Sequence, residues 1–490
     1  MKPVVVWFRQ DLRLADQRAL VAAAATGAPV MPLYILDDST PGAWRMGGAS
    51  RWWLNRSLAS LEQTLAELGS QLVLRSGPTS DVISAFVAQT GAKAIYTQAA
   101  YEPWASMLEG TVNAALRTQG VELKRFAGAL LKPPGALRTK GSDQPFKVYS
   151  PFWRALCASA PPAVPLPAPS VLKRPAAWPE SEAIAAWNLH PSQPDWSAGF
   201  DAHWRPGEAG AYDRLERFLT TALRDYAGER NRPDRPGTSR LSPHLHFGEI
   251  SPATCWYAAR AAADRLAAEG LTADKGLETF HKELVWREFA AHLLVHWPDL
   301  PEAPFKPEYA AFPWAQDARD LKAWQRGKTG YPIVDAGMRE LWHTGWMHNR
   351  VRMIVASFLI KDLLIPWQQG EAWFWDTLVD ADLASNAASW QWVAGCGADA
   401  APYFRIFNPT RQGEAYDPDG AYVRRWVPEL AKLPAQHIHE PWSAPPIVLA
   451  AAGVTLGESY PHRIVDHAQA RDRALAAVKS IKIVITKNET

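Results

Sequence analysis

The sequence has few cysteines, no long apolar run and almost no net charge. Its three cysteines, Cys157, Cys255 and Cys396, lie far apart and form no CxxC pair. This pattern favours a reducing compartment and argues against a structural zinc site. No run of about 18 apolar residues occurs, so no helix across a bilayer is expected. The net charge of +2 gives no overall positive field. Any nucleic-acid site must therefore be a local patch.

The amino terminus lacks the features of a targeting segment. The apolar run Val4–Phe8 is followed at once by Arg9 and Asp11, which is typical of a buried strand and not of a signal peptide. We therefore expect a cytoplasmic protein. No GxGxxG motif follows this strand, so a dinucleotide site is not supported there. A length of 490 residues predicts two or three domains.

Short apolar runs alternate with helical patterns through residues 1–131. Such alternation predicts an α/β domain with a doubly wound parallel sheet. The expected strands are Val4–Phe8, Val30–Leu36, Gln71–Arg75 and Ala94–Thr97, and the expected helices are Ala15–Ala25, Arg51–Leu68 and Ser80–Thr90.

The composition changes after residue 131. The proline-rich run Pro161–Pro169 can continue neither a helix nor a central strand, so residues 132–205 are interpreted as an interdomain linker. Residues 206–480 are predicted to form an all-α domain, and residues 481–490 a short tail. The clearest amphipathic helices in the α domain are Ala211–Tyr226, Pro252–Glu269, Leu277–His296 and Val351–Leu364.

Tryptophan is concentrated between Gly330 and Ala394, where seven occur beside acids, an asparagine and a His-Asn-Arg run. Indoles beside polar groups suggest base stacking or electron transfer. The alternative is an aromatic-rich helical core.

Three further patterns carry polar chemistry. In the loop Gly237–Ser251, Ser242 and Ser251 precede prolines and are expected to start helices. Such a loop can offer hydroxyl and N–H groups to a phosphate, although a simple capping loop is the commoner structure.

On a helix, Glu283, Trp286 and Arg287 share one face, as do Asn386 and Trp390. A carboxylate beside an indole can bind a base edge while the ring stacks. The alternative is a surface Glu-Arg pair beside a core tryptophan.

Eight sequence blocks, in order, resemble the cryptochrome/photolyase family, and most closely the class I cyclobutane pyrimidine dimer photolyases of bacteria. The blocks are WFRQDLRLADQRAL (Trp7–Leu20), GTSRLSPHL (Gly237–Leu245), ELVWREF (Glu283–Phe289), GKTGYPIVDAGMREL (Gly327–Leu341), GWMHNRVRM (Gly345–Met353), ASFLIKDLLIPW (Ala356–Trp367), DADLASNAASWQW (Asp380–Trp392) and DAAPYFRIFNPTRQGE (Asp399–Glu414).

The resemblance implies light-driven DNA repair, in which photoexcited reduced FAD gives an electron to a pyrimidine dimer. It implies FAD contacts from Tyr226, Thr238, Ser239, Arg240, Leu241, Ser242, Arg287, Asp380, Ala381, Asp382 and Asn386. It also implies an electron-transfer chain of Trp390, Trp367 and Trp314. Glu283 and Asn386 are the other expected catalytic residues, and no metal ion is expected.

The implied partner is UV-damaged DNA whose dimer flips out of the helix, and the protein is expected to be a monomer. The residues expected at the lesion or the strand are Arg230, Glu283, Trp286, Asn349, Arg350, Met353, Trp392 and Gln412. An antenna chromophore is also implied: methenyltetrahydrofolate is the first expectation, with a deazaflavin, another flavin or an empty site as alternatives. The segment Tyr101–Ala105 lacks the Asn-Glu pair that resembles folate binding in some relatives.

Two other functions occur in the same family. A cryptochrome-type photoreceptor would signal through a protein partner, but Asn386 stands where plant cryptochromes carry aspartate. Repair of the (6-4) photoproduct is associated with a paired histidine where this chain has His348-Asn349. Asn386 and Asn349 therefore both favour repair of cyclobutane dimers.

Overall fold

The computed structural model describes residues 1–400 and 404–488, with side chains up to residue 481. The chain divides into two units, and each contains segments that are distant in sequence. Unit 1 comprises Met1–Asp225, Ser239–Pro298 and Val379–Asp382; unit 2 comprises Tyr226–Thr238, Asp299–Leu378 and Leu383–Thr490. Among the described residues, no helix has the length and apolarity needed to cross a membrane.

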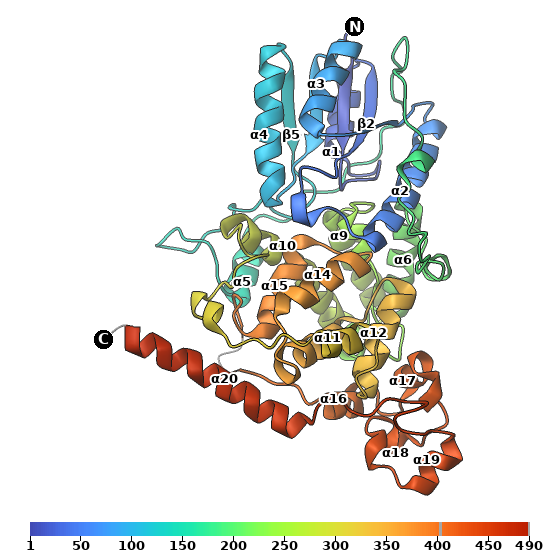
Figure 1. The fold of residues 1–490 in the computed structure, drawn as a ribbon. Helices are drawn as coiled ribbons and strands as arrows, with labels where there is room; N and C mark the ends of the chain where they lie inside the picture. Colours follow the sequence, from blue (N-terminus) through green and yellow to red (C-terminus); the bar gives the residue numbers. More distant parts are fainter. Residues whose placement is uncertain (401–403, 489–490) are drawn as a thin grey trace. The chain divides into compact units, whose positions relative to one another are not determined.

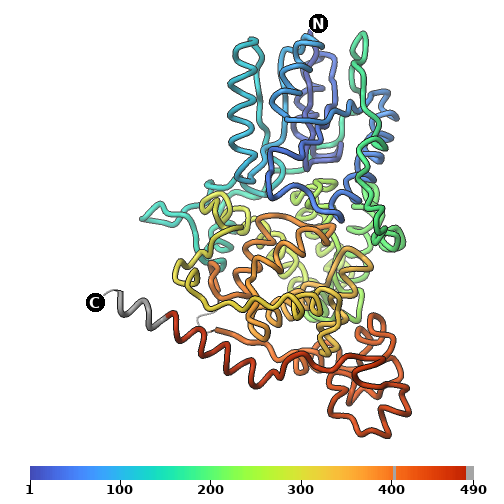
Figure 2. Tube along the Cα trace, viewed as in Figure 1, coloured from blue at the N-terminus to red at the C-terminus, as the bar shows by residue number. Residues whose placement is uncertain are grey.

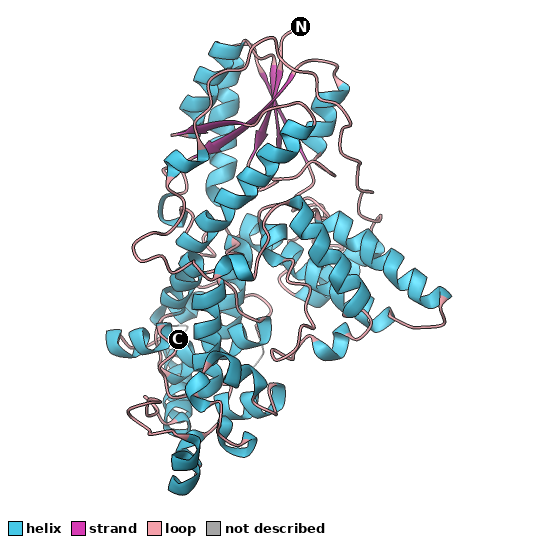
Figure 3. Cartoon of the chain, turned by 90° about the vertical axis from the view of Figure 1, so that its right-hand side faces the viewer, coloured by secondary structure: helices cyan, strands magenta, loops and turns pink. Residues whose placement is uncertain are grey.

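Unit 1 contains a five-stranded parallel sheet with the order β3-β2-β1-β4-β5. The strands are β1 (Val4–Phe8), β2 (Val30–Leu36), β3 (Val73–Ser76), β4 (Ala94–Gln98) and β5 (Glu122–Phe126). The strand order reverses at β1, which pairs with β2 on one side and β4 on the other. Helices flank the sheet on both sides (Figure 3). The predicted doubly wound α/β fold is therefore confirmed.

Burial explains which elements of this sheet could be predicted. Strands β1, β2 and β4 are buried along their whole length, as expected for apolar strands covered on both faces. Strand β5, with the sequence ELKRF, is a largely exposed edge strand and has no apolar run to reveal it. The sheet helices are α1 (Arg18–Ala25), α2 (Gly48–Glu67), α3 (Thr79–Thr90) and the unpredicted α4 (Pro103–Thr118).

The segment 132–205 contains a helix that the sequence did not reveal, α5 (Tyr149–Ala158). Its buried residues Tyr149, Phe152 and Leu156 are three and four positions apart, so they form one face. This face packs against α10 (Asp274–His296) of the same unit. The proline run Pro161–Pro169 forms neither helix nor strand, in agreement with its composition.

The rest of unit 1 is mostly helical, and buried polar groups connect it to the loop after β1 and to helix α2. Its other helices are α6 (Glu208–Thr221), α8 (Ser242–His246) and α9 (Pro252–Ala268). In Figure 2 these segments lie below the blue trace of the sheet. The buried guanidinium of Arg13 donates to the backbone oxygen of Gly248 at 2.8 Å. The carboxylate of Glu249 accepts hydrogen bonds from Trp53 Nε1 at 2.9 Å and from Gly207 N at 2.7 Å.

Unit 2 is built from helices, which confirms the predicted helical character of the carboxy-terminal half (Figure 1). They are α7 (Tyr226–Glu229), α11 (Ala318–Gln325), α12 (Pro332–Thr344), α13 (Asn349–Ser357), α14 (Trp367–Thr377), α15 (Leu383–Ala394), α16 (Pro409–Tyr416), α17 (Ala421–Trp426), α18 (Ala435–Ile438), α19 (Pro446–Ala452) and α20 (His467–Asn488).

Two sequence interpretations in unit 2 need correction. The helix expected over Val351–Leu364 is divided, because α13 ends at Ser357 and a π-helical turn follows at Phe358–Asp362. Of the short tail expected over 481–490, the part up to Asn488 belongs to α20, and 489–490 lie outside the described residues. Ile481 is buried with Ala474 and Val478 against Phe312 and Leu364, so tertiary packing holds this part of α20.

Candidate active site

Helix α10 of unit 1 presents the predicted carboxylate and indole on one face. Glu283 is half-buried, and the Trp286 side chain remains 38% exposed. The spacing of three positions places both groups on the same side of a regular helix. An accessible indole beside a carboxylate is suited to stacking on one base and hydrogen-bonding another.

The next two residues anchor α10 within unit 1. Arg287 donates to the backbone oxygens of Ala129 at 2.8 Å and Leu245 at 3.3 Å. Glu288 accepts hydrogen bonds from the backbone N–H groups of Leu131 at 2.9 Å and Lys132 at 3.1 Å. Burial raises the pKa of Glu288 to about 7, although the positive charge of Arg287 and these two N–H donors oppose the shift. Arg287 thus has a structural role in addition to the flavin contact that the resemblance implies.

The predicted phosphate loop has an electropositive part in unit 1. Arg240 has a φ of 52°, a left-handed conformation that is uncommon for residues other than glycine. The pKa of Arg214 is lowered to about 10 by burial and by the positive charges of Arg240 and Arg217. Arg240 of the loop and Arg214 and Arg217 of α6 thus make this part of unit 1 electropositive.

Both predicted helix starts in this loop are confirmed. Ser242 begins α8, and the Ser251 side chain caps α9 by accepting a hydrogen bond from Thr254 N at 3.0 Å. The neighbouring segment of predicted FAD contacts, Asp380–Asp382, also belongs to unit 1. Its Asp382 carboxylate lies 3.9 Å from Nδ1 of His246, a buried histidine of α8.

Helices α14 and α15 of unit 2 bring together a polar pair and an aromatic pair. Asn386 Nδ2 donates to the backbone oxygen of Glu371 at 3.1 Å. One turn further along α15, Trp390 packs edge-on against Phe374, with ring centroids 5.0 Å apart. The glycine at position 370 of α14 lets the Trp390 ring come this close to the helix, because a Cβ atom there would lie 2.1 Å from Trp390 Cη2.

Glu371 is a residue that the sequence reasoning missed. It is 1% exposed, and its Oε1 atom has no hydrogen-bond partner among the described residues. Burial, and to a lesser extent the negative charge of Glu302, raise the pKa of Glu371 well above its ordinary value. Its only signal in the sequence is an acid among aromatic residues in GEAWFW.

The three tryptophans of the expected electron-transfer chain lie in unit 2 and differ in exposure. Trp390 is 2% exposed and Trp367, at the start of α14, is 1% exposed. Trp314 is half-buried and packs against Phe312, with ring centroids 4.3 Å apart. The exposures therefore agree with a path that begins inside the unit and ends near its surface.

Several predicted strand-contacting residues of unit 2 form a cationic group. Arg350 donates to Asn231 Oδ1 at 2.9 Å and places its guanidinium 4.5 Å from the Tyr416 ring centroid. Burial lowers the pKa of Arg350, and the positive charges of Arg230 and Arg405 lower it further. This repulsion fits a site for DNA phosphates. Arg405 was not among the residues that the resemblance implies at the strand.

The remaining lesion candidates of unit 2 lie on three helices. Asn349 is exposed at the first position of α13, and Met353 on the same helix is half-buried. Half-buried Trp392 on α15 donates through Nε1 to the backbone oxygen of Asp399 at 3.1 Å. Gln412 is half-buried on α16. Tyr226 and Thr238 also belong to unit 2, and Arg230 lies 5.8 Å from the Tyr226 ring centroid.

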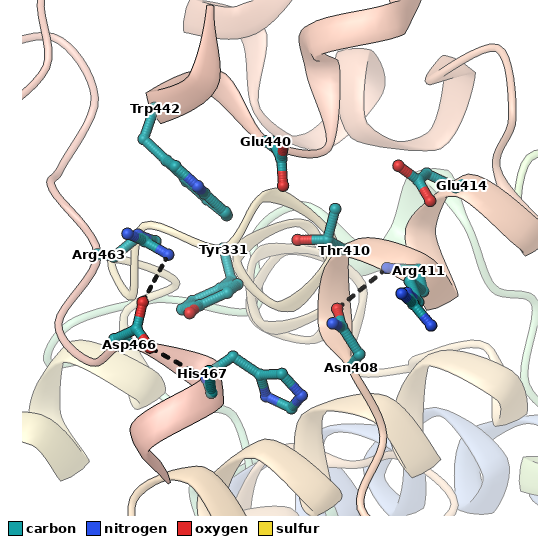
Figure 4. Close-up of a pocket in the computed structure, with 11 residues that line it drawn as sticks. Tyr331, Asn408, Thr410, Arg411, Glu414, Glu440, Trp442, Arg463, Asp466 and His467 are labelled. Atoms are coloured by element: carbon teal, nitrogen blue, oxygen red, sulfur yellow. Dashed lines mark hydrogen bonds and ion pairs between the residues drawn. The ribbon is translucent and has the colours of Figure 1, made fainter. Parts of the chain in front are cut away.

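A separate pocket of about 330 Å³ lies in unit 2 (Figure 4). It is lined by Tyr331, Asn408, Thr410, Arg411, Glu414, Glu440, Trp442, Arg463, Asp466, His467 and Ala468. None of these was predicted to bind a ligand, and the lining carries both acids and bases. Among residues 1–400 and 404–488, no group of three potential His, Cys, Asp or Glu ligands for a metal ion is found.

Comparisons with known proteins now place the chain. Residues 4–170 match the DNA photolyase family, and residues 280–480 match the FAD binding domain of DNA photolyase. A deoxyribodipyrimidine photo-lyase of Agrobacterium fabrum is 51% identical over 98% of this chain and 98% of its own. The chain belongs to the cryptochrome/photolyase family.

Other family members refine this assignment. Cryptochrome-1 of Arabidopsis thaliana is 40% identical over 95% of this chain and 69% of its own. A solved structure described as a bacterial class III photolyase from Agrobacterium tumefaciens superposes with a TM-score of 0.94, at 51% identity and with 98% of each chain covered. The family resemblance is thus confirmed. The class I subgroup stays a prediction, because this similar structure is described as a class III photolyase.

Proposed function

We propose that the protein is a deoxyribodipyrimidine photo-lyase, which splits cyclobutane pyrimidine dimers in UV-damaged DNA under light. The observation that carries the proposal is the face of α10, where a half-buried carboxylate and an accessible indole lie one helical turn apart. The end-to-end similarity to a photo-lyase supports the same reaction. Reduced FAD, when bound and excited by light, supplies the electron that opens the dimer.

The residues proposed to hold FAD divide by chemistry. Hydroxyl groups, backbone N–H groups and the cation Arg240 would bind its phosphates, while Asn386 would face the flavin ring. The full proposed set is Tyr226, Thr238, Ser239, Arg240, Leu241, Ser242, Arg287, Asp380, Ala381, Asp382 and Asn386. The electropositive surroundings of Arg240 support the phosphate assignment.

The residues proposed at the substrate would bind bases and backbone separately. Glu283 would hydrogen-bond the dimer bases, Trp286, Trp392 and Met353 would pack on them, and Arg230, Asn349, Arg350 and Gln412 would contact the lesion or strand. Flipping costs a few kcal/mol, and each stacked aromatic ring contributes roughly 1–3 kcal/mol, so two indoles can offset the flip. Trp390, Trp367 and Trp314 would relay an electron between the interior of unit 2 and its surface.

An antenna chromophore, a monomeric state and a cytoplasmic location complete the proposal. Methenyltetrahydrofolate is the proposed antenna, and a deazaflavin is the alternative. The absorption spectrum of chromophores released by denaturing the purified protein distinguishes them, since each absorbs at its own wavelength. A spectrum showing flavin alone would remove the antenna from the proposal.

Repair by a matched pair of α10 variants tests the main function. Glu283→Gln should lower light-dependent repair of dimer-containing DNA by at least about tenfold. The reason is that a hydrogen bond from a charged group to the reacting base typically contributes that much. Glu278→Gln, which removes an exposed carboxylate paired with Lys282 on the same helix, should repair normally. Flavin content should be equal in both.

The alternative function is that of a cryptochrome-type photoreceptor. Purified wild-type protein with fully reduced flavin that left every dimer intact under near-UV or blue light would refute repair and support the photoreceptor. Normal repair by Glu283→Gln would instead remove Glu283 from the site and leave the enzyme class standing.

A further inference from the structure

We propose that Tyr149, in the segment interpreted as an interdomain linker, is a positioning residue that holds the Trp286 indole ready to stack on the lesion. The proposal rests on the proposed function, because it assigns a partner to one of its lesion-binding residues. Both residues belong to unit 1, Tyr149 on α5 and Trp286 on α10.

The two rings form a parallel stack. Their centroids are 3.7 Å apart and their planes differ by 5°. Tyr149 is itself buried, with an exposure of 6%, whereas Trp286 is 38% exposed. Because the phenol ring covers one face of the indole, the exposed surface of Trp286 belongs to its other face and edges. A base that stacks there would extend an existing column of rings.

Additional contacts fix the position of this stack. The Tyr149 hydroxyl donates to the backbone oxygen of Lys282 at 2.7 Å, one residue before Glu283. Phe289 meets both rings edge-on, with centroids 5.9 Å from Tyr149 and 5.9 Å from Trp286. A half-exposed tryptophan without such neighbours could adopt several rotamers, and only some would meet a flipped base. Fixing one rotamer before binding removes that entropic cost.

Phe152 provides a matched control on the same helix face. It is 4% exposed and packs against Phe289 and His292, with ring centroids 5.3 Å and 5.2 Å away. Truncating Phe152 therefore perturbs the same aromatic cluster but leaves the parallel stack on Trp286 in place. Any general loosening of α5 against α10 should affect both variants.

The experiment measures dissociation constants for dimer-containing and undamaged duplexes in the dark. Tyr149→Leu should weaken binding of the damaged duplex by about fivefold, as expected from losing one aromatic pair, and leave binding of the undamaged duplex unchanged. Tyr149→Phe keeps the ring and should bind within about twofold of wild type. Phe152→Leu should lower the melting temperature without changing the preference for damaged DNA. Repair per bound lesion should stay constant in all three.

A double-variant cycle separates positioning from packing. In a Trp286→Ala background, Tyr149→Leu should cause no further loss of lesion affinity, because Tyr149 acts through the indole. If Tyr149→Leu purifies without flavin, Tyr149→Met replaces the ring by a flexible chain of similar length and serves in the same cycle.

Three outcomes would overturn the inference. Wild-type lesion affinity in Tyr149→Leu would show that the stack does not prepare the site. An equal loss in the Trp286→Ala background would show that Tyr149 acts independently of the indole. Unchanged affinity in Trp286→Ala alone would remove Trp286 from the lesion site and the inference with it, whereas a failure of the proposed function itself would appear as absent repair by the wild-type protein.

Discussion

The two units each bury an ionisable side chain whose pKa is shifted to about 7, but from opposite sides. In unit 1, Glu288 is 3% exposed, and burial raises the pKa of its carboxyl to about 7. In unit 2, Lys361 is 3% exposed, and burial lowers the pKa of its amine to about 7. Removal from water disfavours the charged form in both cases. Burial therefore favours the protonated form of Glu288 and the deprotonated form of Lys361.

The partners of the two groups explain why each is tolerated. Glu288 accepts hydrogen bonds from the backbone N–H groups of Leu131 and Lys132. These residues follow Ala129, whose backbone oxygen binds Arg287. Lys361 donates to the backbone oxygen of Arg405 and lies 4.5 Å from the Phe404 ring centroid. Neither contact is an ion pair, so each group is nearly as stable neutral as charged. In both cases burial outweighs an adjacent opposite charge, Arg287 for Glu288 and Asp362 for Lys361, and moves the pKa to near neutral pH.

The largest expected effect belongs to Lys361→Met. An amine with a lowered folded-state pKa is protonated more readily in the unfolded chain, so wild type should lose stability as pH falls from about 10.5 toward about 7. Relative to Lys361→Met, the loss between pH 10 and pH 7 should reach up to about 4 kcal/mol. Urea unfolding at a series of pH values measures it, with exposed Lys432→Met as the control for removing one lysine. Parallel curves for wild type and Lys361→Met would show that the amine is not buried.

Glu288→Gln should show the opposite pH dependence, with a smaller amplitude. A carboxyl with a raised folded-state pKa stabilises the fold fully below about 4.5, and this contribution is lost as pH rises through about 7. The difference in free energy of unfolding between wild type and Glu288→Gln should therefore decline by up to about 3 kcal/mol over that range. Glu278→Gln on the same helix controls for the loss of an exposed acid. A difference that grows with pH would contradict the assigned direction.

Gly370→Ala tests the close approach of α14 to Trp390 in unit 2. The added Cβ would lie 2.1 Å and 2.5 Å from two carbons of the indole and 2.7 Å from Leu359 Cδ2. Such overpacking of a buried ring should lower the free energy of unfolding by about 2 kcal/mol. Chemical denaturation measures the loss, and slower photoreduction of the flavin would report displacement of Trp390. An unchanged midpoint would mean that α14 shifts freely.

Gly110→Ala in unit 1 is the counterpart of Gly370→Ala and should have the smallest effect on stability. Gly110 lies within α4, and a Cβ there would have no heavy atom within 4 Å. Replacing a helical glycine in open space should stabilise the protein by about 0.5–1 kcal/mol, because alanine loses less backbone entropy. The sign is therefore opposite to that of Gly370→Ala, and thermal melting of the two variants side by side measures both. Destabilisation by both changes would point to backbone strain in α4.

Short-range patterns predicted a large part of the molecule. The spacing of Glu283 and Trp286 placed them on one helical face, and Ser251 before proline predicted the cap that the structure shows. These features depend only on neighbours within one or two turns. The edge strand β5 was missed because its largely exposed sequence has no apolar run, and the helix α5 was missed because it lies in the segment interpreted as a linker.

The candidate site illustrates the same division. The resemblance supplied Asn386, but its hydrogen bond to Glu371 connects two helices and has no local signature. The role proposed for Tyr149 depends on the ring of Trp286, which lies 137 positions further along the chain. The roles proposed for the FAD-binding and lesion-binding residues remain predictions until the variants are measured.

By itself, the sequence determined the family, the doubly wound sheet followed by helices, and the residue types available for a flavin and a damaged base. Only the tertiary structure decided which ionisable groups lose water, where α13 gives way to a π-helical turn, and which ring covers the indole of Trp286. The physical reason is that hydrophobic periodicity and capping act over a few residues, whereas desolvation and ring stacking depend on segments that only folding brings together.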